Sequence, residues 1–341
     1  MFRKLLKFEL SLHTKQVGFW ITVGIMFLAG ILIMSTASFS GNAVGEKVKA
    51  NGAIQIAGII SSMNIALIFF GAVFTVTGAM RDDIHKSLEV IHSTPMKTKN
   101  MIWARFTGIF LIVFACLSAL IVGLFAGQFV PWIDKETLGP INPLYFLHPL
   151  FFYGLISSLL VTAFYILMAG FTRNRTMVYI SAIALFLVLT AIGLISDVDK
   201  LKPLAGLIDP FGTAAIINET EFWPADEQNI RFVPFTKAVL FNRLLWLIIA
   251  MASIWFAQSL FKRGIVTRKL KNKSKKATTL APAHVAGVVK VNTASPKNAK
   301  LSRFWTRFKY EYLTTVKSVP FIILFLLALS FFITVFFVRD Q

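Results

Sequence analysis

Seven long stretches of this 341-residue sequence contain no Asp, Glu, Lys or Arg, and they limit what the chain can fold into. These stretches are 16–45, 50–80, 106–133, 137–172, 176–196, 244–261 and 318–338. Each can supply the roughly 17–25 apolar residues that cross about 30 Å of hydrocarbon as a helix. Only 15% of all residues are charged and 56% are hydrophobic, which a soluble fold cannot hide from water. The sequence therefore predicts an all-α polytopic membrane protein embedded in a lipid bilayer.

The stretches divide the chain into two membrane modules of unequal completeness. Six spans are predicted within residues 1–265, at about 17–40, 54–80, 106–130, 148–171, 177–196 and 240–261. The basic, aromatic-poor tract 266–300 has the composition of a flexible cytosolic linker. Residues 303–321 then repeat residues 1–19 without gaps, so that Glu311 matches Glu9. We expect residues 301–341 to hold the amphipathic helix and first span of a second module in a longer chain.

Lys and Arg are distributed unevenly among the segments between the spans. If the N-terminus is cytoplasmic, 26 of the 35 basic residues lie in cytosolic segments. This bias follows the positive-inside rule, and the basic run after the sixth span can also contact anionic lipid. The net charge of +19 is thereby explained without nucleic acid, which we exclude as a partner. The outer loop 197–238 is too long for a simple connection, and we expect it to pack as short helices over the bundle.

The N-terminal segment has the pattern of an amphipathic helix lying in the membrane interface. Glu9 points into its apolar face, and Glu311 does so in the repeat. A carboxylate in that position is costly unless it is paired or hydrogen-bonded. Two interpretations remain open: a fixed contact to a neighbouring cytoplasmic element, or a local pair four residues away, with His13 for Glu9 and Arg307 for Glu311.

The cytosolic segment 81–95 predicts a short helix that a cytosolic partner contacts. An acid at its start can cap the helix, an apolar stripe runs along it and a proline ends it. The residues concerned are Asp82, Asp83, Ile84, Leu88, Ile91 and Pro95. His85, Glu89 and His92 are spaced to share a metal ion, but the sequence offers no partner to orient the histidines. We therefore predict no metal site.

The order of residues in 81–95 carries a family resemblance. An acidic pair, then Ser-Leu-Glu and Ser-Thr-Pro, then a basic stretch and a new span resemble the intracellular loop of ABC-2-type transporter permeases. The amphipathic helix with Glu9 is similar to the elbow helix of that family, and the resemblance covers 1–265. It implies the six-helix ABC-2 (type V exporter-like) module in a bacterial cytoplasmic (inner) membrane. It also implies that Asp82, Asp83, Ile84, Leu88, Glu89, Ile91 and Pro95 form an ATPase-coupling helix.

A narrower resemblance lies near the sixth span. Its residues are Asp209-Pro210-Phe211-Gly212, Trp223, Asn229, Pro234, Asn242-Arg243 and Trp246. They are similar to the permease subclass whose chain continues into an M1-type aminopeptidase domain. Asp209 suits a turn before Pro210, and Arg243 lies where its side chain can snorkel towards lipid head groups. We expect this set to shape the outer cap without touching substrate.

Motifs for chemistry are missing from the 341 residues. No Gly-rich Walker-type loop and no His-Glu-x-x-His motif occurs, and Cys116 is the single cysteine. We predict a non-enzymatic permease subunit without cofactors of its own. A separate cytosolic ABC ATPase would bind ATP and Mg, and a second ABC-2 module would pair with this one in cis or trans. The alternative is a membrane anchor that positions a fused or partner M1-type aminopeptidase.

Overall fold

The fold is described from a computed structural model of the chain. The structure describes residues 1–37, 48–84, 98–196, 198–276, 305–306 and 309. Contacts divide the chain into two units, Met1–Arg263 and Gly264–Gln341. The helices described below lie in the first unit, except that the last of them continues past Arg263, and the candidate site lies within the first unit.

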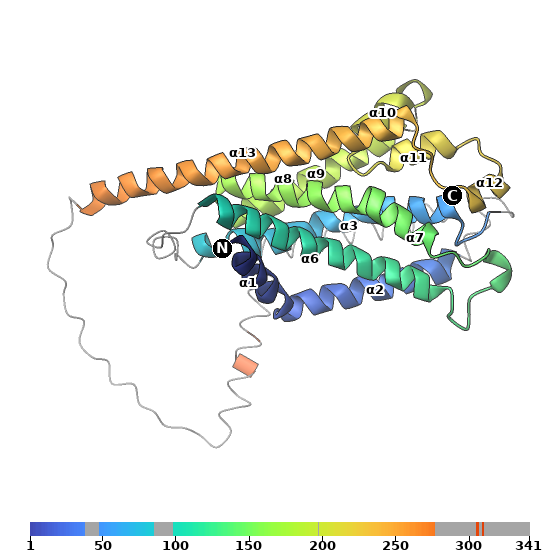
Figure 1. The fold of residues 1–341 in the computed structure, drawn as a ribbon, viewed down its shortest axis with the longest axis horizontal. Helices are drawn as coiled ribbons and strands as arrows, with labels where there is room; N and C mark the ends of the chain where they lie inside the picture. Colours follow the sequence, from blue (N-terminus) through green and yellow to red (C-terminus); the bar gives the residue numbers. More distant parts are fainter. Residues whose placement is uncertain (38–47, 85–97, 197, 277–304, 307–308, 310–341) are drawn as a thin grey trace, which may run out of the picture. The chain divides into compact units, whose positions relative to one another are not determined.

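Every regular element in the described residues is helical, and the long helices run alternately up and down one bundle (Figure 1). The long helices are α2 (Val17–Ala37), α3 (Ala53–Ala79), α6 (Thr98–Gly127), α8 (Leu155–Thr172), α9 (Arg175–Ser196) and α13 (Lys237–Lys276). The shorter elements are α1 (Phe2–Thr14), α4 (Arg81–Ile84), η2 (Lys135–Thr137), α7 (Leu144–Pro149), η3 (Leu150–Gly154), η4 (Asp199–Leu201), α10 (Lys202–Ile208), α11 (Thr213–Thr220) and α12 (Ala225–Ile230).

Six helices in the described ranges are long and apolar enough to cross a membrane. They cover Val17–Ser35, Ala53–Ala79, Thr98–Gly127, Leu144–Thr172, Arg175–Ser196 and Lys237–Phe261. The predicted all-helical, multi-pass fold is therefore confirmed at this level. At least half of the span residues are buried in α3, α6 and α7–α8, against fewer than a third in α2, α9 and α13. The first three thus form the interior of the bundle, and the last three lie at its periphery.

Three helix boundaries differ from the sequence prediction. α6 starts at Thr98 rather than near 106, because Arg105 finds partners inside the protein and does not end the apolar helix. The fourth span starts at Leu144 and continues past Pro149 through the π-helical turn η3, whose wider turn accommodates a residue without an amide hydrogen. α13 is helical to Lys276, so the start of the predicted linker is helix, which Lys and Arg near a helix C-terminus favour.

α2 and α6 approach each other closely through glycines. A Cβ atom on Gly30 would lie 2.2 Å from the Leu120 carbonyl oxygen, and one on Gly123 would lie 2.1 Å from the Phe27 carbonyl oxygen. Any side chain at either position would force the two backbones apart. Small residues at an interface commonly let membrane helices approach closely, since lipid gives no hydrophobic drive for their association.

The two ends of the bundle differ in what covers them. One end, called here the α1 end, carries residues 2–14 and 81–84, and α1 packs across the start of α6 (Figure 1). The opposite end, called the cap end, carries residues 135–143 and 198–236. There η4, α10, α11 and α12 pack on the ends of α3 and α9. The loop predicted to fold as short helices over the bundle does so.

Candidate functional site

The α1 helix is held against the bundle by a face that is not fully apolar. Glu9 and His13, four residues apart, are its two buried residues. Two glycines provide their space: a Cβ on Gly108 of α6 would lie 2.8 Å from the Glu9 Cβ, and one on Gly78 of α3 would lie 2.8 Å from the His13 Nε2. The amphipathic pattern therefore docks α1 by placing a carboxylate and an imidazole over the ends of two interior helices.

The Glu9 carboxylate is paired with arginines from two other elements. Arg81 of α4 donates from Nη1 to Glu9 Oε2 at 2.7 Å and from Nη2 to Glu9 Oε1 at 2.6 Å. Arg105 of α6 places its Nε 3.5 Å from Glu9 Oε1. Of the two interpretations of Glu9, the structure shows the contact to neighbouring elements. Paired hydrogen bonds between a guanidinium and a carboxylate fix both distance and orientation.

Asp82 completes a cluster of four charges, and we call Glu9, Arg81, Asp82 and Arg105 the charge cluster. Arg105 donates through Nη2 to the Asp82 carboxylate and through Nη1 to the Ala79 carbonyl oxygen, the latter at 3.4 Å. Arg81 Nε lies 3.5 Å from Asp82 Oδ1. Two acids face two arginines, so the cluster is neutral as a whole. Glu9, Asp82 and Arg105 are each less than 5% exposed, so water does little to screen them.

Burial makes the charge cluster sensitive to the loss of any one member. Desolvation offsets much of the attraction within a buried ion pair, so an intact pair adds little net stability. Removal of one partner leaves an uncompensated charge and typically costs 3–5 kcal/mol. The cluster therefore acts chiefly as a fixed joint that links α1, α4 and α6 in one arrangement.

His13 lies beside the charge cluster without joining it. Burial, with a smaller contribution from the positive charge of Arg81, lowers the pKa of His13 from 6.5 to about 4. Its ring stands edge-on to Phe74 with ring centroids 6.0 Å apart, and neither ring nitrogen has a hydrogen-bond partner in the described residues. The imidazole is consequently neutral at physiological pH and fills space between α1 and α3.

Only part of the predicted coupling helix can be compared with the structure. Asp82 is buried in the charge cluster, and Ile84 is 41% exposed at the end of α4. Asp83 lies in α4 as well. Leu88, Glu89, Ile91 and Pro95, together with His85 and His92, lie outside the described residues, as does Glu311. Across the part of the chain that the structure describes, no group of three or more His, Cys, Asp or Glu residues could hold a metal ion.

At the cap end, Asp209 and Asn242 tie the predicted outer-cap residues together. The Asp209 carboxylate accepts from the amides of Phe211 at 2.9 Å and Ala214 at 2.8 Å, which satisfies a free amide at the start of α11. The Asn242 side-chain amide of α13 donates to the carbonyl oxygens of Gly206 at 2.7 Å and of Leu207 and Asp209 at 2.9 Å each. These bonds anchor the turn between α10 and α11 to the start of the last span.

The prediction that Arg243 snorkels towards lipid is wrong. Its side chain is 2% exposed, donates to Asn242 Oδ1 at 2.9 Å and to the Pro210 carbonyl oxygen at 3.3 Å, and lies 5.3 Å from the Tyr153 ring centroid. The carbonyl groups of the α10–α11 turn offer acceptors inside the protein, so the guanidinium has no need of head groups. Gly212 makes room for it: its φ is +79°, and a Cβ there would lie 2.5 Å from Arg243 Nη2.

The two arginines that pair with Glu9 were not predicted from the sequence. A signal was nevertheless present, because Arg81 directly follows one charge-free stretch and Arg105 directly precedes the next. Basic residues at both borders, and a carboxylate on an apolar helix face, are complementary charges that lie at the same membrane depth.

Comparisons with known proteins add no further information, since no protein-family model, curated protein or solved structure matches the chain.

Proposed function

We propose that the chain is the transmembrane permease subunit of an ATP-binding-cassette exporter. In this proposal it couples ATP hydrolysis on a separate subunit to substrate movement across a bacterial inner membrane. The observation that carries the proposal is the charge cluster at the α1 end, which joins a helix outside the spans to the ends of interior spans. Segment 81–95 and the N-terminal helix resemble the coupling and elbow helices of the ABC-2 permeases. The resemblance implies that the charge cluster transmits motion from an ATPase.

The charge cluster suits the transmission of force. A partner that pushes on α1 or α4 meets elements held by directional, buried ion pairs rather than by loose apolar contact. Because Arg81 lies two residues after the end of α3 and Arg105 belongs to α6, displacement of the joint would move two interior spans together. If α1 were held by loose apolar contacts alone, it could shift without moving the spans.

The distribution of charge supports an orientation with the α1 end in the cytosol. Of the 35 Lys and Arg residues, 26 lie in segments that this orientation places on the cytosolic side. An ATPase that holds ATP and Mg would then contact α1 and the 81–95 segment. The exposed apolar faces of α2, α9 and α13 offer room for both lipid and a second six-helix module beside this one.

The test is whether ATP hydrolysis accompanies the chain when it is purified from its native membrane. We expect vanadate-sensitive ATPase activity to co-elute with the tagged full chain in mild detergent. The double variant Glu9→Gln with Arg81→Gln should lose this activity at equal recovery. Glu227→Gln, an exposed acid at the cap end, is the matched control and should retain it.

Two results would decide against the proposal. An eluate of the wild-type chain without ATP hydrolysis would contradict a permease role. If that eluate instead hydrolysed an amino-acid anilide in a metal-dependent way, the chain would be an anchor for an M1-type aminopeptidase.

A further inference from the structure

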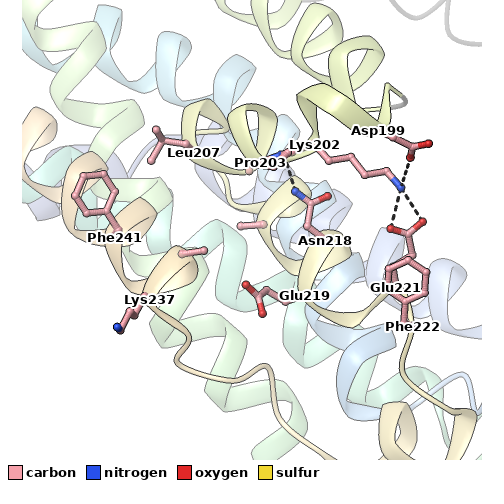
Figure 2. Close-up of a pocket in the computed structure, with 13 residues that line it drawn as sticks. Asp199, Lys202, Pro203, Leu207, Asn218, Glu219, Glu221, Phe222, Lys237 and Phe241 are labelled. Atoms are coloured by element: carbon pink, nitrogen blue, oxygen red, sulfur yellow. Dashed lines mark hydrogen bonds and ion pairs between the residues drawn. The ribbon is translucent and has the colours of Figure 1, made fainter.

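A cavity of about 720 Å³ opens at the cap end between α10, α11 and the start of α13 (Figure 2). Its volume lies within the range of pockets that enclose small molecules, about 300–1,000 Å³. The wall is mainly apolar and includes Pro203, Leu207, Ala215, Phe222, Ala238 and Phe241. Phe222 is 88% exposed and Phe241 is 58% exposed, so both aromatic rings are available to a bound molecule.

The positive charge of Lys202 on the cavity wall is already neutralised. Its Nζ lies 3.1 Å from Asp199 Oδ1 and donates to both oxygens of Glu221, at 2.8 and 2.9 Å (Figure 2). The hydrogen bonds to Glu221 and Asp199 raise the pKa of Lys202. This cation therefore stays charged, and its donors face carboxylates of the protein rather than a ligand.

Glu219 is the carboxylate that remains available. It lines the cavity, is partly buried, and has no hydrogen bond or ion pair in the part of the chain that the structure describes. Figure 2 shows Lys237, the other basic residue of the lining, pointing away from Glu219. The cavity thus combines an apolar wall with one uncompensated negative charge.

We propose that this cavity binds an amphipathic organic cation. The ammonium group would pair with Glu219, and the apolar body would pack on Leu207 and the ring of Phe241. An anion would meet three carboxylates, Asp199, Glu219 and Glu221, and only two lysines, so the site disfavours anionic amphiphiles. A neutral apolar molecule would fill the wall but leave Glu219 without a partner.

The experiment measures binding of decylammonium and of neutral decanol to the purified full chain in a non-ionic maltoside micelle. Glu219→Gln removes the charge and keeps the shape, while Glu227→Gln removes an exposed acid that does not line the cavity. We expect Glu219→Gln to weaken decylammonium binding about ten-fold, as loss of a hydrogen bond between charged groups does. Glu227→Gln should leave binding unchanged, and neither variant should alter decanol binding.

Partition into the micelle is the same for all three proteins and cancels in the comparison. Equal thermal unfolding of wild type and Glu219→Gln shows that a loss of binding is local. Phe241→Ala should weaken binding of both probes, because it removes apolar wall without changing charge. Equal decylammonium affinity in wild type and Glu219→Gln would overturn the proposal, and so would an equal loss in Glu227→Gln.

The same ammonium chemistry occurs in free amines and in the ethanolamine head group of lipids. Addition of phosphatidylethanolamine to the micelles separates these sources. Competition with decylammonium in wild type but not in Glu219→Gln would support the site with lipid as its occupant. Unchanged affinity would support it with a free amine. Binding by the purified chain needs no ATPase, so the result is independent of the transport proposal.

Discussion

Arg81 and Glu9 meet through two hydrogen bonds, of 2.7 and 2.6 Å, although 72 positions separate them in the sequence. Arg105 also lies near Glu9, and Asp82 in turn pairs with Arg105. The pair therefore fixes an N-terminal helix outside the spans to the point where α3 gives way to α4. Its energetic role can be measured independently of any transport activity.

The first prediction is strong coupling between Glu9 and Arg81. Glu9→Ala leaves the charge cluster with a net charge of +1, and Arg81→Ala leaves it with −1, so each should lower the free energy of unfolding by about 3–5 kcal/mol. The double variant leaves Arg105 and Asp82 as a neutral pair, and its loss should be clearly smaller than the sum of the two. Unfolding in mixed micelles with increasing dodecyl sulfate measures these values.

Glu227 and Arg231 form the matched control pair. They are 2.8 Å apart, lie four residues apart in sequence and are exposed to solvent. Their coupling should be only about 0.3–0.5 kcal/mol. Additive losses at Glu9 and Arg81, or equal coupling in the two pairs, would show that the charge cluster does not act as a unit.

The second prediction concerns the contact of α2 with α6. Gly30→Ala places a Cβ 2.2 Å from the Leu120 carbonyl oxygen, and backbone cannot move aside as a flexible side chain can. We expect a loss of about 1–3 kcal/mol or more in the free energy of unfolding. Gly24→Ala, on the same helix with nothing within 4 Å of the new Cβ, should be neutral or slightly stabilising. Similar losses in both variants would contradict this packing.

The membrane-length helices could be predicted because the cost of a charge in hydrocarbon is large and local. A stretch without ionisable residues is therefore nearly sufficient to identify a span. The same criterion misplaced the start of α6, because Arg105 is neutralised by Asp82 and Glu9 and so lies within the helix. Helix ends depend on partners from elsewhere in the chain, and a single sequence does not contain that pairing.

The site residues could likewise be predicted only in part. Glu9 was identified from its place on an apolar helix face, but its partners follow from the packing of three elements. Asp209 and Asn242 belong to the predicted cap set and do lie together. The contact is made through backbone carbonyl groups, which a residue pattern does not predict. The cavity with Glu219 could not be predicted, since its wall combines residues from α10, α11 and α13 that are each unremarkable in sequence.

The third prediction concerns the cap. Asn242→Ala removes the donor to three carbonyl groups, two of them in buried hydrogen bonds, and leaves them without that partner. We expect a loss of at least about 2 kcal/mol and faster proteolysis between α10 and α11, because unpaired buried polar groups cost about 1–3 kcal/mol each. Asn142→Ala, which removes one exposed bond to the Leu144 amide, should cost about 1 kcal/mol or less. Equal effects would contradict the anchoring role of Asn242.

The last prediction is a pH dependence that comes from His13. Above about pH 6.5 its imidazole is neutral in both the folded and the unfolded chain, so it adds no pH dependence. As the pH falls towards 4, the unfolded chain binds a proton that the folded chain excludes, because burial and the charge of Arg81 lower the pKa to about 4. The free energy of unfolding should therefore fall by up to about 3 kcal/mol across this range.

His13→Gln isolates this contribution. The variant keeps every carboxylate, including Glu9 and Asp82, so acid titration common to both proteins cancels in the difference between their curves. Unfolding followed from pH 7.5 to 4.5 should show a shallower decline in the variant, with the two curves diverging below about pH 6.5. Parallel curves would mean that the folded protein accepts a proton on His13 without cost. The imidazole would then have to lie in water or beside a carboxylate, rather than between Gly78 and Phe74.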